Sequence, residues 1–336
     1  MGSRRNHISL RDPGGPPHAV KEMEEGHLPV MVEEVIDLLS PVPGSFQIDA
    51  TLGGGGHTLR ILEANAPDGR VLGLDADPAA VERTQARLAR FGDRLVVRQT
   101  NFAAIGSVAR EAGFPAVDGI LMDLGLSSFQ LAEEGRGFSF RAAGPLDMRF
   151  DPGTGIPASE LIARSSVDEL TDLFRRLGEE PHARRIARAI VAERERTPIA
   201  TGAQLAAVVE RAVPAPRGGR SRIHPATRVF QALRIAVNRE LEVLAEALED
   251  ALLLLRPGGR LVVIAYHSLE DRIVKRFVAA ERRGCICPPS FPVCSCGLAP
   301  RLRPVGHQPL LPSDAEVARN PRARSARLRC AERLAA

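Results

Sequence analysis

The chain of 336 residues contains no tryptophan, one tyrosine and only two lysines among its 45 basic residues. No apolar run approaches the roughly 18 residues that a membrane-spanning helix needs. No apolar stretch follows Arg4 and Arg5, which argues against a signal peptide or a twin-arginine leader. The five cysteines are odd in number and crowd the C-terminal quarter, which does not suit a disulfide framework. We therefore expect a cytoplasmic protein of about two domains that does not associate with a membrane.

The net charge of +4 is unevenly distributed along the chain. From Glu281 to the end there are ten arginines and four acidic residues. A second basic patch, residues 214–228, contains Arg217, Arg220, Arg222 and Arg228 and no acid. Genomic base composition explains a preference for arginine over lysine, but it does not explain the clustering. Clustered arginines favour a polyanionic partner such as a nucleic acid.

Short apolar strands and helices alternate up to Asp123. The expected strands are 46–50, 70–74, 95–98 and 117–122. Helices are expected after Pro29, from about His57, and after Asp77, where Pro78 suits the first helical position. This rhythm predicts an α/β fold with a parallel, doubly wound sheet.

The alternation stops after Asp123. From about Gly135 to Arg239 we expect only helical segments, among them 167–177, 183–194 and 203–212. A helix over 226–255 then precedes a fifth strand at 261–266. The simplest account is a helical domain inserted between the fourth and fifth strands. The predicted organisation is a disordered extension (1–26), the first part of the α/β domain (27–134), the helical insertion (135–239), and the second part with its basic C-terminal region (240–336).

A glycine-rich loop, Gly53–Gly56, lies where the first strand becomes a helix. Glycines there let a ligand approach the backbone closely, and the helix start offers free N–H groups. Asp75 ends the second strand 22 residues after Gly53, where an acid accepts hydrogen bonds from a ribose diol. The alternative is a glycine-rich turn with a capping aspartate.

The loop departs from the pattern that binds dinucleotides. The third glycine of that pattern is missing, because Thr58 or Leu59 stands in its place. Asp49, at the end of the first strand, would repel phosphate but suits a cofactor with a cationic amino-acid end. S-adenosylmethionine has such an end together with a ribose, so these residues favour it over a nicotinamide dinucleotide.

Several acids and one histidine follow the later strands. Asp123 comes directly after the fourth strand, at the edge where such sheets bind ligands. It is a candidate partner for a nucleophile beside a reactive methyl group, or else a cap of the next turn. His267, Asp147 and Arg149 are weaker candidates for a position near the substrate, with structural roles as the alternative.

Four of the cysteines form two pairs, Cys285-x-Cys287 and Cys294-x-Cys296. Zinc sites usually place two or more residues between paired cysteines, so this spacing is not that of a standard ribbon or finger. Metal binding, reduced structural thiols and redox pairing all stay open. We assign no metal ligand from the sequence.

In order along the chain, these motifs resemble the bacterial ribosomal RNA small subunit methyltransferase H family from about residue 27 to the end. The matching segments are His27-x-Pro29-Val30, Asp49-x-Thr51-x-Gly53-x-Gly55-Gly56-His57, Asp75-x-Asp77-Pro78, Asn101-Phe102, Asp123-Leu124-Gly125-x-Ser127-Ser128-x-Gln130, Gly144-Pro145-Leu146-Asp147-Met148-Arg149, His224-Pro225-Ala226-Thr227-Arg228, Phe230-Gln231-Ala232-Leu233-Arg234-Ile235, His267-Ser268-Leu269-Glu270-Asp271-Arg272 and Asn320-Pro321-Arg322.

The resemblance implies a Rossmann-like class I S-adenosylmethionine methyltransferase sheet with an inserted all-helical domain. It implies methylation of N4 of a cytidine in the decoding region of 16S rRNA. We expect the RNA to be methylated within the small ribosomal subunit, and free rRNA stays open as the alternative substrate. The oligomeric state also stays open, a homodimer included. The cofactor-binding residues that it implies are Gly55, Gly56, His57, Asp75, Phe102, Asp123 and Gln130.

Asp123 is also our hypothesis for the catalytic residue, as the group that accepts a hydrogen bond from the cytosine amine. The same aspartate would then both bind the cofactor and act on the substrate. Three other functions stay in competition with RNA methylation. The chain could methylate a small molecule or a protein, although the basic patches argue against this. It could be a non-catalytic RNA-binding assembly factor, which would predict decay of the glycine loop or of Asp75. A nicotinamide-dependent dehydrogenase is the weakest of the three.

Overall fold

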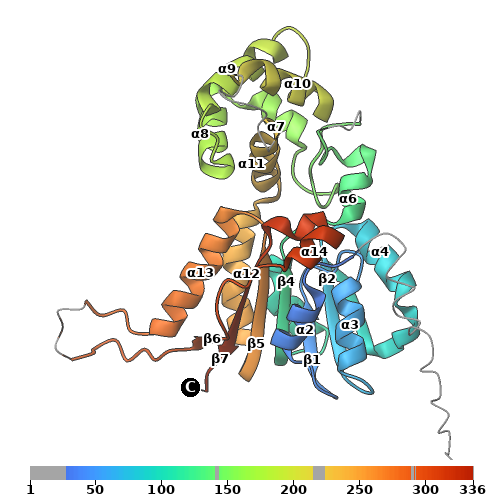
Figure 1. The fold of residues 1–336 in the computed structure, drawn as a ribbon, viewed down its shortest axis with the longest axis vertical. Helices are drawn as coiled ribbons and strands as arrows, with labels where there is room; N and C mark the ends of the chain where they lie inside the picture. The colour runs from blue at the N-terminus through green and yellow to red at the C-terminus, as the bar shows by residue number, and fades with distance from the viewer. Residues whose placement is uncertain (1–27, 141–143, 215–223, 289–290, 292, 336) are drawn as a thin grey trace, which may run out of the picture.

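The computed structural model describes residues 28–335 except 141–143, 215–223, 289–290 and 292. The predicted disordered extension, 1–26, and three arginines of the basic patch, Arg217, Arg220 and Arg222, lie outside these residues. Figure 1 shows a lower lobe built on a sheet and an upper lobe built of helices. Within the described ranges, no helix is both long and apolar enough to cross a membrane.

In the described part of the chain, seven strands form one sheet in the order β3-β2-β1-β4-β5-β7-β6. Their bounds are β1 (Phe46–Asp49), β2 (Arg70–Asp75), β3 (Leu95–Gln99), β4 (Val117–Asp123), β5 (Leu255–Ala265), β6 (Leu302–Pro304) and β7 (Arg327–Arg333). Strands β1 to β5 are parallel, whereas β7 runs antiparallel to both β5 and β6. The order is that of a doubly wound α/β sheet, so the predicted fold class is confirmed. The predicted parallel arrangement is confirmed for β1 to β5, and the sequence did not predict β6 or the antiparallel β7.

Both faces of the sheet are covered by helices, because successive side chains of a strand point to opposite faces. In β4, Ile120 and Met122 join one apolar core, while Leu121 joins the other. The core that contains Leu121 also contains side chains of α2 (Val32–Leu39) and α3 (Gly56–Ala64), with Leu88 just after α4 (Pro78–Arg87). The opposite core is closed by α5 (Ile105–Glu111), α12 (Glu240–Leu254) and α13 (Ser268–Arg283).

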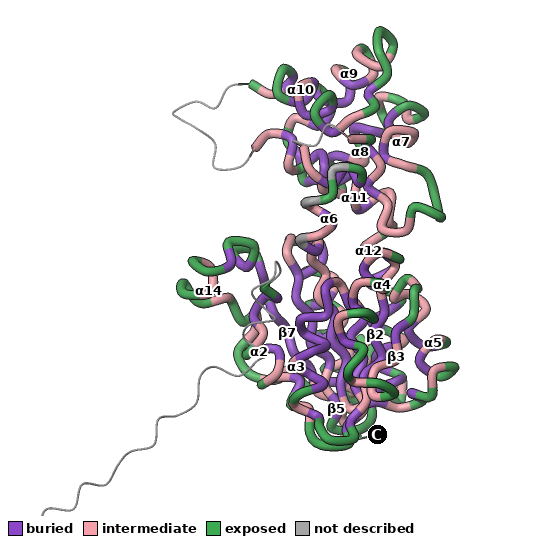
Figure 2. The backbone as a smooth tube through the Cα atoms, turned by 90° about the vertical axis from the view of Figure 1, so that its right-hand side faces the viewer, coloured by how far each residue is buried: buried purple, intermediate pink, exposed green. Residues whose placement is uncertain are grey.

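The upper lobe has an apolar core of its own, visible in Figure 2 as buried backbone separate from that of the sheet. Its helices are α7 (Ala158–Arg164), α8 (Val167–Gly178), α9 (Ala183–Arg194), α10 (Gly202–Ala212) and α11 (Thr227–Asn238). The fully buried side chains of this core include Phe174, Ile186 and Leu233. In the described part of 135–239 there is no strand, only an isolated bridge between Pro145 and Thr201. The short helix α6 (Ser128–Ala132) leads from the sheet toward this lobe.

The helix expected over 226–255 is two helices. Arg239 has a left-handed backbone (φ +51°) and separates α11 from α12. A bidentate ion pair between Arg234 and Glu240, at 2.7 and 2.8 Å, spans the break. The apolar pattern continues through it, so periodicity alone could not reveal it. The break lets α11 pack in the upper lobe and α12 pack on the sheet.

Candidate active site

The carboxyl ends of β1, β2, β4 and β5 meet at the edge of the sheet that faces the helical lobe (Figure 1). Two adjoining cavities open there. The larger, about 360 Å³, lies between the loop after β1 and the helical lobe, and we call it the glycine-loop cavity. The smaller, about 90 Å³, lies beside the end of β2, and we call it the Asp75 cavity. Thr51, Gly53 and Asp123 line both, so they form the border between the two.

The glycine loop is shaped by close packing. Gly53 and Gly55 have left-handed backbones (φ +51° and +72°), which glycine adopts without strain. A Cβ atom at Gly55 would lie 2.6 Å from Cγ2 of Thr84, and one at Gly56 would lie 2.8 Å from Pro29. Gly53 and Gly56 line the glycine-loop cavity, whereas Gly55 lines neither cavity. Gly55 therefore helps to shape the loop by packing against Thr84, on the side away from the cavities.

Asp75, the last residue of β2, is half-buried and lines the cavity named after it. Its Oδ2 accepts a hydrogen bond from the Gly53 N–H (2.7 Å), and its Oδ1 accepts one from the Asp77 N–H (2.9 Å). Burial, with help from the nearby carboxylates of Asp77 and Asp49, raises the pKa of Asp75 to about 6. A carboxylate oxygen offers two lone pairs, so each oxygen keeps one acceptor site. Two adjacent sites of this kind match a ligand with neighbouring hydroxyl groups.

Asp123, the last residue of β4, is held from two sides. Its N–H donates to Oγ1 of Thr51 (2.7 Å), and its Oδ1 accepts from the Tyr266 hydroxyl (2.8 Å). Burial and the negative charge of Asp123 raise the pKa of Tyr266 well above its ordinary value, so the phenol stays protonated and keeps donating. The sequence reasoning missed this role of Tyr266. The signal that could have found it is the position of the chain's single tyrosine just past the fifth strand.

His57, in the first turn of α3, is buried and lines the glycine-loop cavity. Its Nε2 lies 3.0 Å from the carbonyl oxygen of Val30. Because a carbonyl only accepts, Nε2 carries the hydrogen of this bond. Its Nδ1 lies 3.8 Å from Oδ2 of Asp123. His57 therefore joins the segment before α2 to the loop and faces the carboxylate at the border of the cavities.

Phe102 and Gln130 both line the Asp75 cavity. Gln130 lies on α6, where its side-chain oxygen accepts from the Ser127 N–H (3.1 Å) and its amide nitrogen donates to Oδ2 of Asp77 (3.3 Å). Arg136 donates to the same oxygen of Asp77 (3.0 Å). Asp77 also caps α4, so this buried network fixes α6 and α4 on either side of the cavity.

Asp49 has an internal role. It is 1% exposed and lines neither cavity. Its carboxylate accepts from the Thr58 hydroxyl (2.7 Å) and from the Thr51 N–H (3.2 Å), which fixes the start of α3. Asp49 is therefore not placed to contact a ligand in either cavity, and the expectation that its charge suits a cationic ligand group stays a prediction.

The three weaker candidates from the sequence, His267, Asp147 and Arg149, differ in their position relative to the two cavities. His267 lines the glycine-loop cavity and also caps α13, where its Nδ1 accepts from the Glu270 N–H (3.4 Å). Asp147 and Arg149 form a bidentate ion pair at 2.8 Å and line neither cavity. The structure thus brings His267 to the site. Arg149 lines a third cavity, of about 480 Å³, that shares Asn101 and Phe150 with the Asp75 cavity, whereas Asp147 does not line it.

Several arginines of the basic C-terminal region form ion pairs within the protein. At least five of its arginines form ion pairs with acids of the chain: Arg301 with Glu281, Arg303 with Glu332, Arg319 with Glu316, and Arg327 and Arg329 with Asp271. The pair of Arg329 with Asp271, at 2.7 Å, is buried and ties β7 to α13. The clustering of arginines after Glu281 therefore has a structural cause as well, and the case for a polyanionic partner rests more on the patch that ends at Arg228.

The chain has extensive similarity to known proteins. A family model described as the MraW methylase family matches residues 24–334. A protein of Thermomicrobium roseum named ribosomal RNA small subunit methyltransferase H is 55% identical over 333 residues, covering 99% of this chain and 98% of that protein. A protein of the same name from Syntrophotalea carbinolica is 52% identical, covering 92% and 98%. Among solved structures, an rRNA methylase from Streptococcus thermophilus is 12% identical with a TM-score of 0.40, covering 90% of this chain and 94% of that one, a likeness too distant to carry an argument.

Proposed function

The chain belongs to the MraW methylase family, and from this premise we propose that it methylates N4 of a cytidine in the decoding region of 16S rRNA. S-adenosylmethionine is its methyl donor. The observation that carries the proposal is the position of Asp123, a carboxylate on the border of two cavities, fixed by Thr51 and Tyr266. The reaction takes place in the cytoplasm, on rRNA within the small ribosomal subunit.

The residues around the Asp75 cavity fit S-adenosylmethionine. The two unused acceptor sites of Asp75 match the two ribose hydroxyls. Phe102 and Gln130 would lie on the adenine side, and Gly56 and His57 on the amino-acid side, with Gly55 supporting the loop from behind. When bound, this cofactor supplies a methyl group activated for attack by a nucleophile.

The pH dependence of cofactor binding follows from Asp75. Ribose hydroxyls donate to the ionised carboxylate, so binding favours that form, and protonation removes an acceptor. With a pKa of about 6 in the free enzyme, affinity for S-adenosylhomocysteine is expected to be constant above pH 7 and about tenfold weaker at pH 5. Calorimetric titration from pH 5 to 8 measures this. The control Asp75→Asn should bind weakly at every pH, and the same pH step in that variant would assign the titration to another group.

Asp123 would help the cytosine amine, which is the group that accepts the methyl, to react. The amine of cytosine is a poor nucleophile because its lone pair is delocalised into the ring. A carboxylate that accepts a hydrogen bond from N4 stabilises the positive charge that develops on this nitrogen and gives its proton a place to go. Tyr266 and Thr51 hold the carboxylate in one orientation, which is what positioning of a reacting group requires.

The helical insertion, 135–239, is the domain that we propose holds the RNA, with 27–134 and 240–336 as the two parts of the methyltransferase domain. Phe140 and Phe230 of the insertion line the glycine-loop cavity, as Asp123 does. The ring of Phe140 stacks on His224, with centroids 4.3 Å apart and planes at 11°. Aromatic rings give an unstacked base a surface to pack on. The cavity thus offers a cytosine an apolar wall on one side and an acceptor on the other.

The basic patch predicts how RNA binding responds to salt. Replacing Arg217, Arg220 and Arg222 by glutamine is expected to weaken binding to small-subunit RNA of any sequence, because phosphate contacts carry no sequence information. The slope of log affinity against log salt should flatten by about one unit per lost contact. Filter binding at several salt concentrations measures the slope.

The matched control replaces three exposed arginines of the sheet lobe that lie outside both basic regions, Arg98, Arg110 and Arg276. This control should keep the wild-type slope, and both variants should keep their affinity for S-adenosylhomocysteine. An unchanged slope in the patch variant would remove the patch from the RNA interface.

The proposed function is tested with the purified full chain and tritium-labelled S-adenosylmethionine. Small subunits from cells that lack the protein are offered beside protein-free 16S rRNA. Label is expected in the RNA of the subunit, in a nucleoside that co-migrates with N4-methylcytidine. Label in a ribosomal protein would favour a protein methyltransferase, and no transfer by a chain that binds the RNA would favour an assembly factor.

A further inference from the structure

A projecting segment, residues 284–301, joins α13 to β6 and extends away from the body of the sheet lobe (Figure 1). Among its described residues none is buried and none lies in a helix or strand. Its apolar side chains are exposed: Ile286, Phe291, Val293 and Leu298. A segment without a core needs another source of order, such as a cross-link or a metal.

The base of the segment is closed. Gly284 ends α13 with a positive φ of +66°, and a Cβ atom there would lie 2.4 Å from the backbone of Ala299. The Arg301 N–H donates to the carbonyl of Glu281 (2.8 Å), and the two side chains form an ion pair. The two ends of the segment therefore run side by side, and residues beyond them face each other across a loop.

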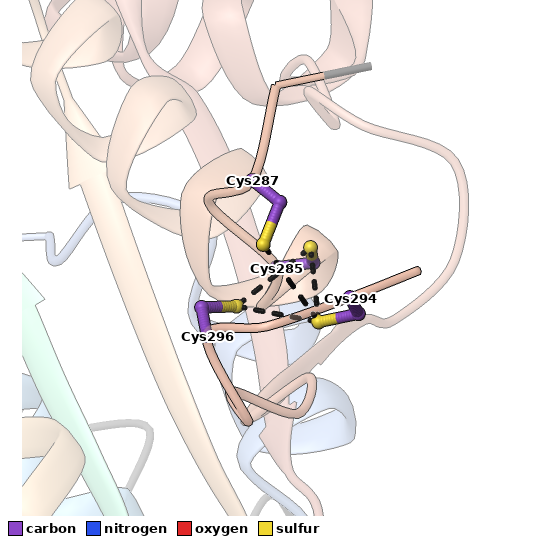
Figure 3. A group of neighbouring side chains, drawn as sticks. All are labelled: Cys285, Cys287, Cys294 and Cys296. Atoms are coloured by element: carbon purple, nitrogen blue, oxygen red, sulfur yellow. Dashed lines mark hydrogen bonds between the residues drawn. The ribbon is translucent and has the colours of Figure 1, made fainter. Parts of the chain in front are cut away.

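Four thiols meet inside this loop, two from each side (Figure 3). The sulfur of Cys294 lies 3.5 Å from those of Cys285 and Cys296 and 4.0 Å from that of Cys287. Cys296 and Cys285 are 3.7 Å apart, and all four sulfurs lie within 4.8 Å of one another. Four thiolates at 2.3 Å from one zinc ion are separated by about 3.8 Å, the edge of the tetrahedron that they form.

The spacing of the pairs explains this arrangement. The two cysteines of each Cys-x-Cys pair are separated by only one residue, and both pairs project their sulfurs into the same group (Figure 3). The Ser295 N–H also points to the Cys287 sulfur at 3.4 Å, the type of outer hydrogen bond that stabilises a bound thiolate. The unusual spacing, which argued against a finger or ribbon, is compatible with a four-sulfur site at the base of a loop.

We propose that Cys285, Cys287, Cys294 and Cys296 bind one Zn²⁺ ion as four thiolates. Soft sulfur ligands in a tetrahedral set of four select zinc among the common divalent ions. None of the four cysteines lines the two cavities, so the ion is structural and takes no part in methyl transfer. It cross-links the two sides of the projecting segment and keeps its apolar side chains displayed. This proposal is independent of the proposed function.

Metal analysis of the full chain, purified without added metal or chelator, tests the proposal. Plasma mass spectrometry is expected to find one zinc per chain. The variant Cys287→Ser with Cys294→Ser should contain none. The matched control Cys330→Ala removes a buried thiol of β7 that lies outside the cluster and should keep its zinc.

Cobalt gives a second readout on the wild-type chain, so failure of a variant to fold leaves the test intact. After reduction and removal of zinc, Co²⁺ is expected to bind with the intense visible bands and thiolate charge-transfer absorption of a tetrahedral four-sulfur site. Zinc should displace it at one equivalent. A wild-type chain that contains no zinc and shows no such cobalt spectrum overturns the proposal, as do two disulfides found by mass spectrometry in the freshly purified protein.

Discussion

Replacing Asp123 by asparagine is expected to lower the turnover rate about 10²-fold or more while changing cofactor affinity little. The substitution keeps the shape and one acceptor oxygen but removes the charge. That charge meets a positive charge that develops only as N4 attacks, so it is worth more in the transition state than in the ground state. Single-turnover rates at saturating cofactor and calorimetry with S-adenosylhomocysteine measure the two quantities on the same protein.

Tyr266→Phe is the companion variant for this experiment. It removes the hydroxyl that donates to Asp123 but leaves the carboxylate in place. Its effect on the rate should be smaller than that of Asp123→Asn, because only the orientation of the acid is loosened. The catalytic hypothesis fails if Asp123→Asn weakens cofactor binding while its single-turnover rate stays near wild type. Asp123 would then hold the cofactor only.

Replacing Asp75 by alanine is expected to weaken binding of S-adenosylhomocysteine about 10–150-fold. The estimate corresponds to the loss of hydrogen bonds to a charged group, about 1.5–3 kcal/mol. The variant also frees the Gly53 N–H, which Asp75 holds at 2.7 Å, so the glycine loop loses an anchor. Calorimetry measures the affinity, and circular dichroism checks that the variant is folded.

The control for this experiment is Asp93→Ala, which removes an exposed aspartate that lines neither cavity. Its affinity should equal that of the wild type. A folded Asp75→Ala protein with wild-type affinity would contradict the assignment of Asp75 to the ribose and with it the placement of the cofactor.

The first five strands could be predicted because each contains a short apolar run beside turn residues. Strand β5 begins at Leu255, six residues before its predicted start, and takes in the expected turn residues 257–259. Strand β7 could not, because three of its seven residues are arginines and it resembles a solvated basic tail. Its burial depends on the ion pair between Arg329 and Asp271, residues 58 positions apart. The break at Arg239 was equally hidden, since it depends on where α11 and α12 pack and not on local sequence.

The same limit applies to the site. Asp75 and Asp123 could be predicted from their positions at strand ends, and both line the cavities. Tyr266 could not, because its contact with Asp123 spans 143 positions and depends on β4 and β5 being neighbours. The internal role of Asp49 could not be predicted for the related reason that Thr58, in the first turn of α3, donates to its carboxylate. Strand-end positions place residues at an edge, while only packing decides which of them face the ligand.

The central claim, methylation of a cytidine amine in 16S rRNA, is tested most directly by mass spectrometry of nucleosides from the decoding region of that RNA. The RNA is taken from cells that lack this protein, before and after the gene is restored. Cytidine methylated at N4 should be absent without the protein and should return with it. If the N4-methylated cytidine persists in cells that lack the protein, the account is contradicted.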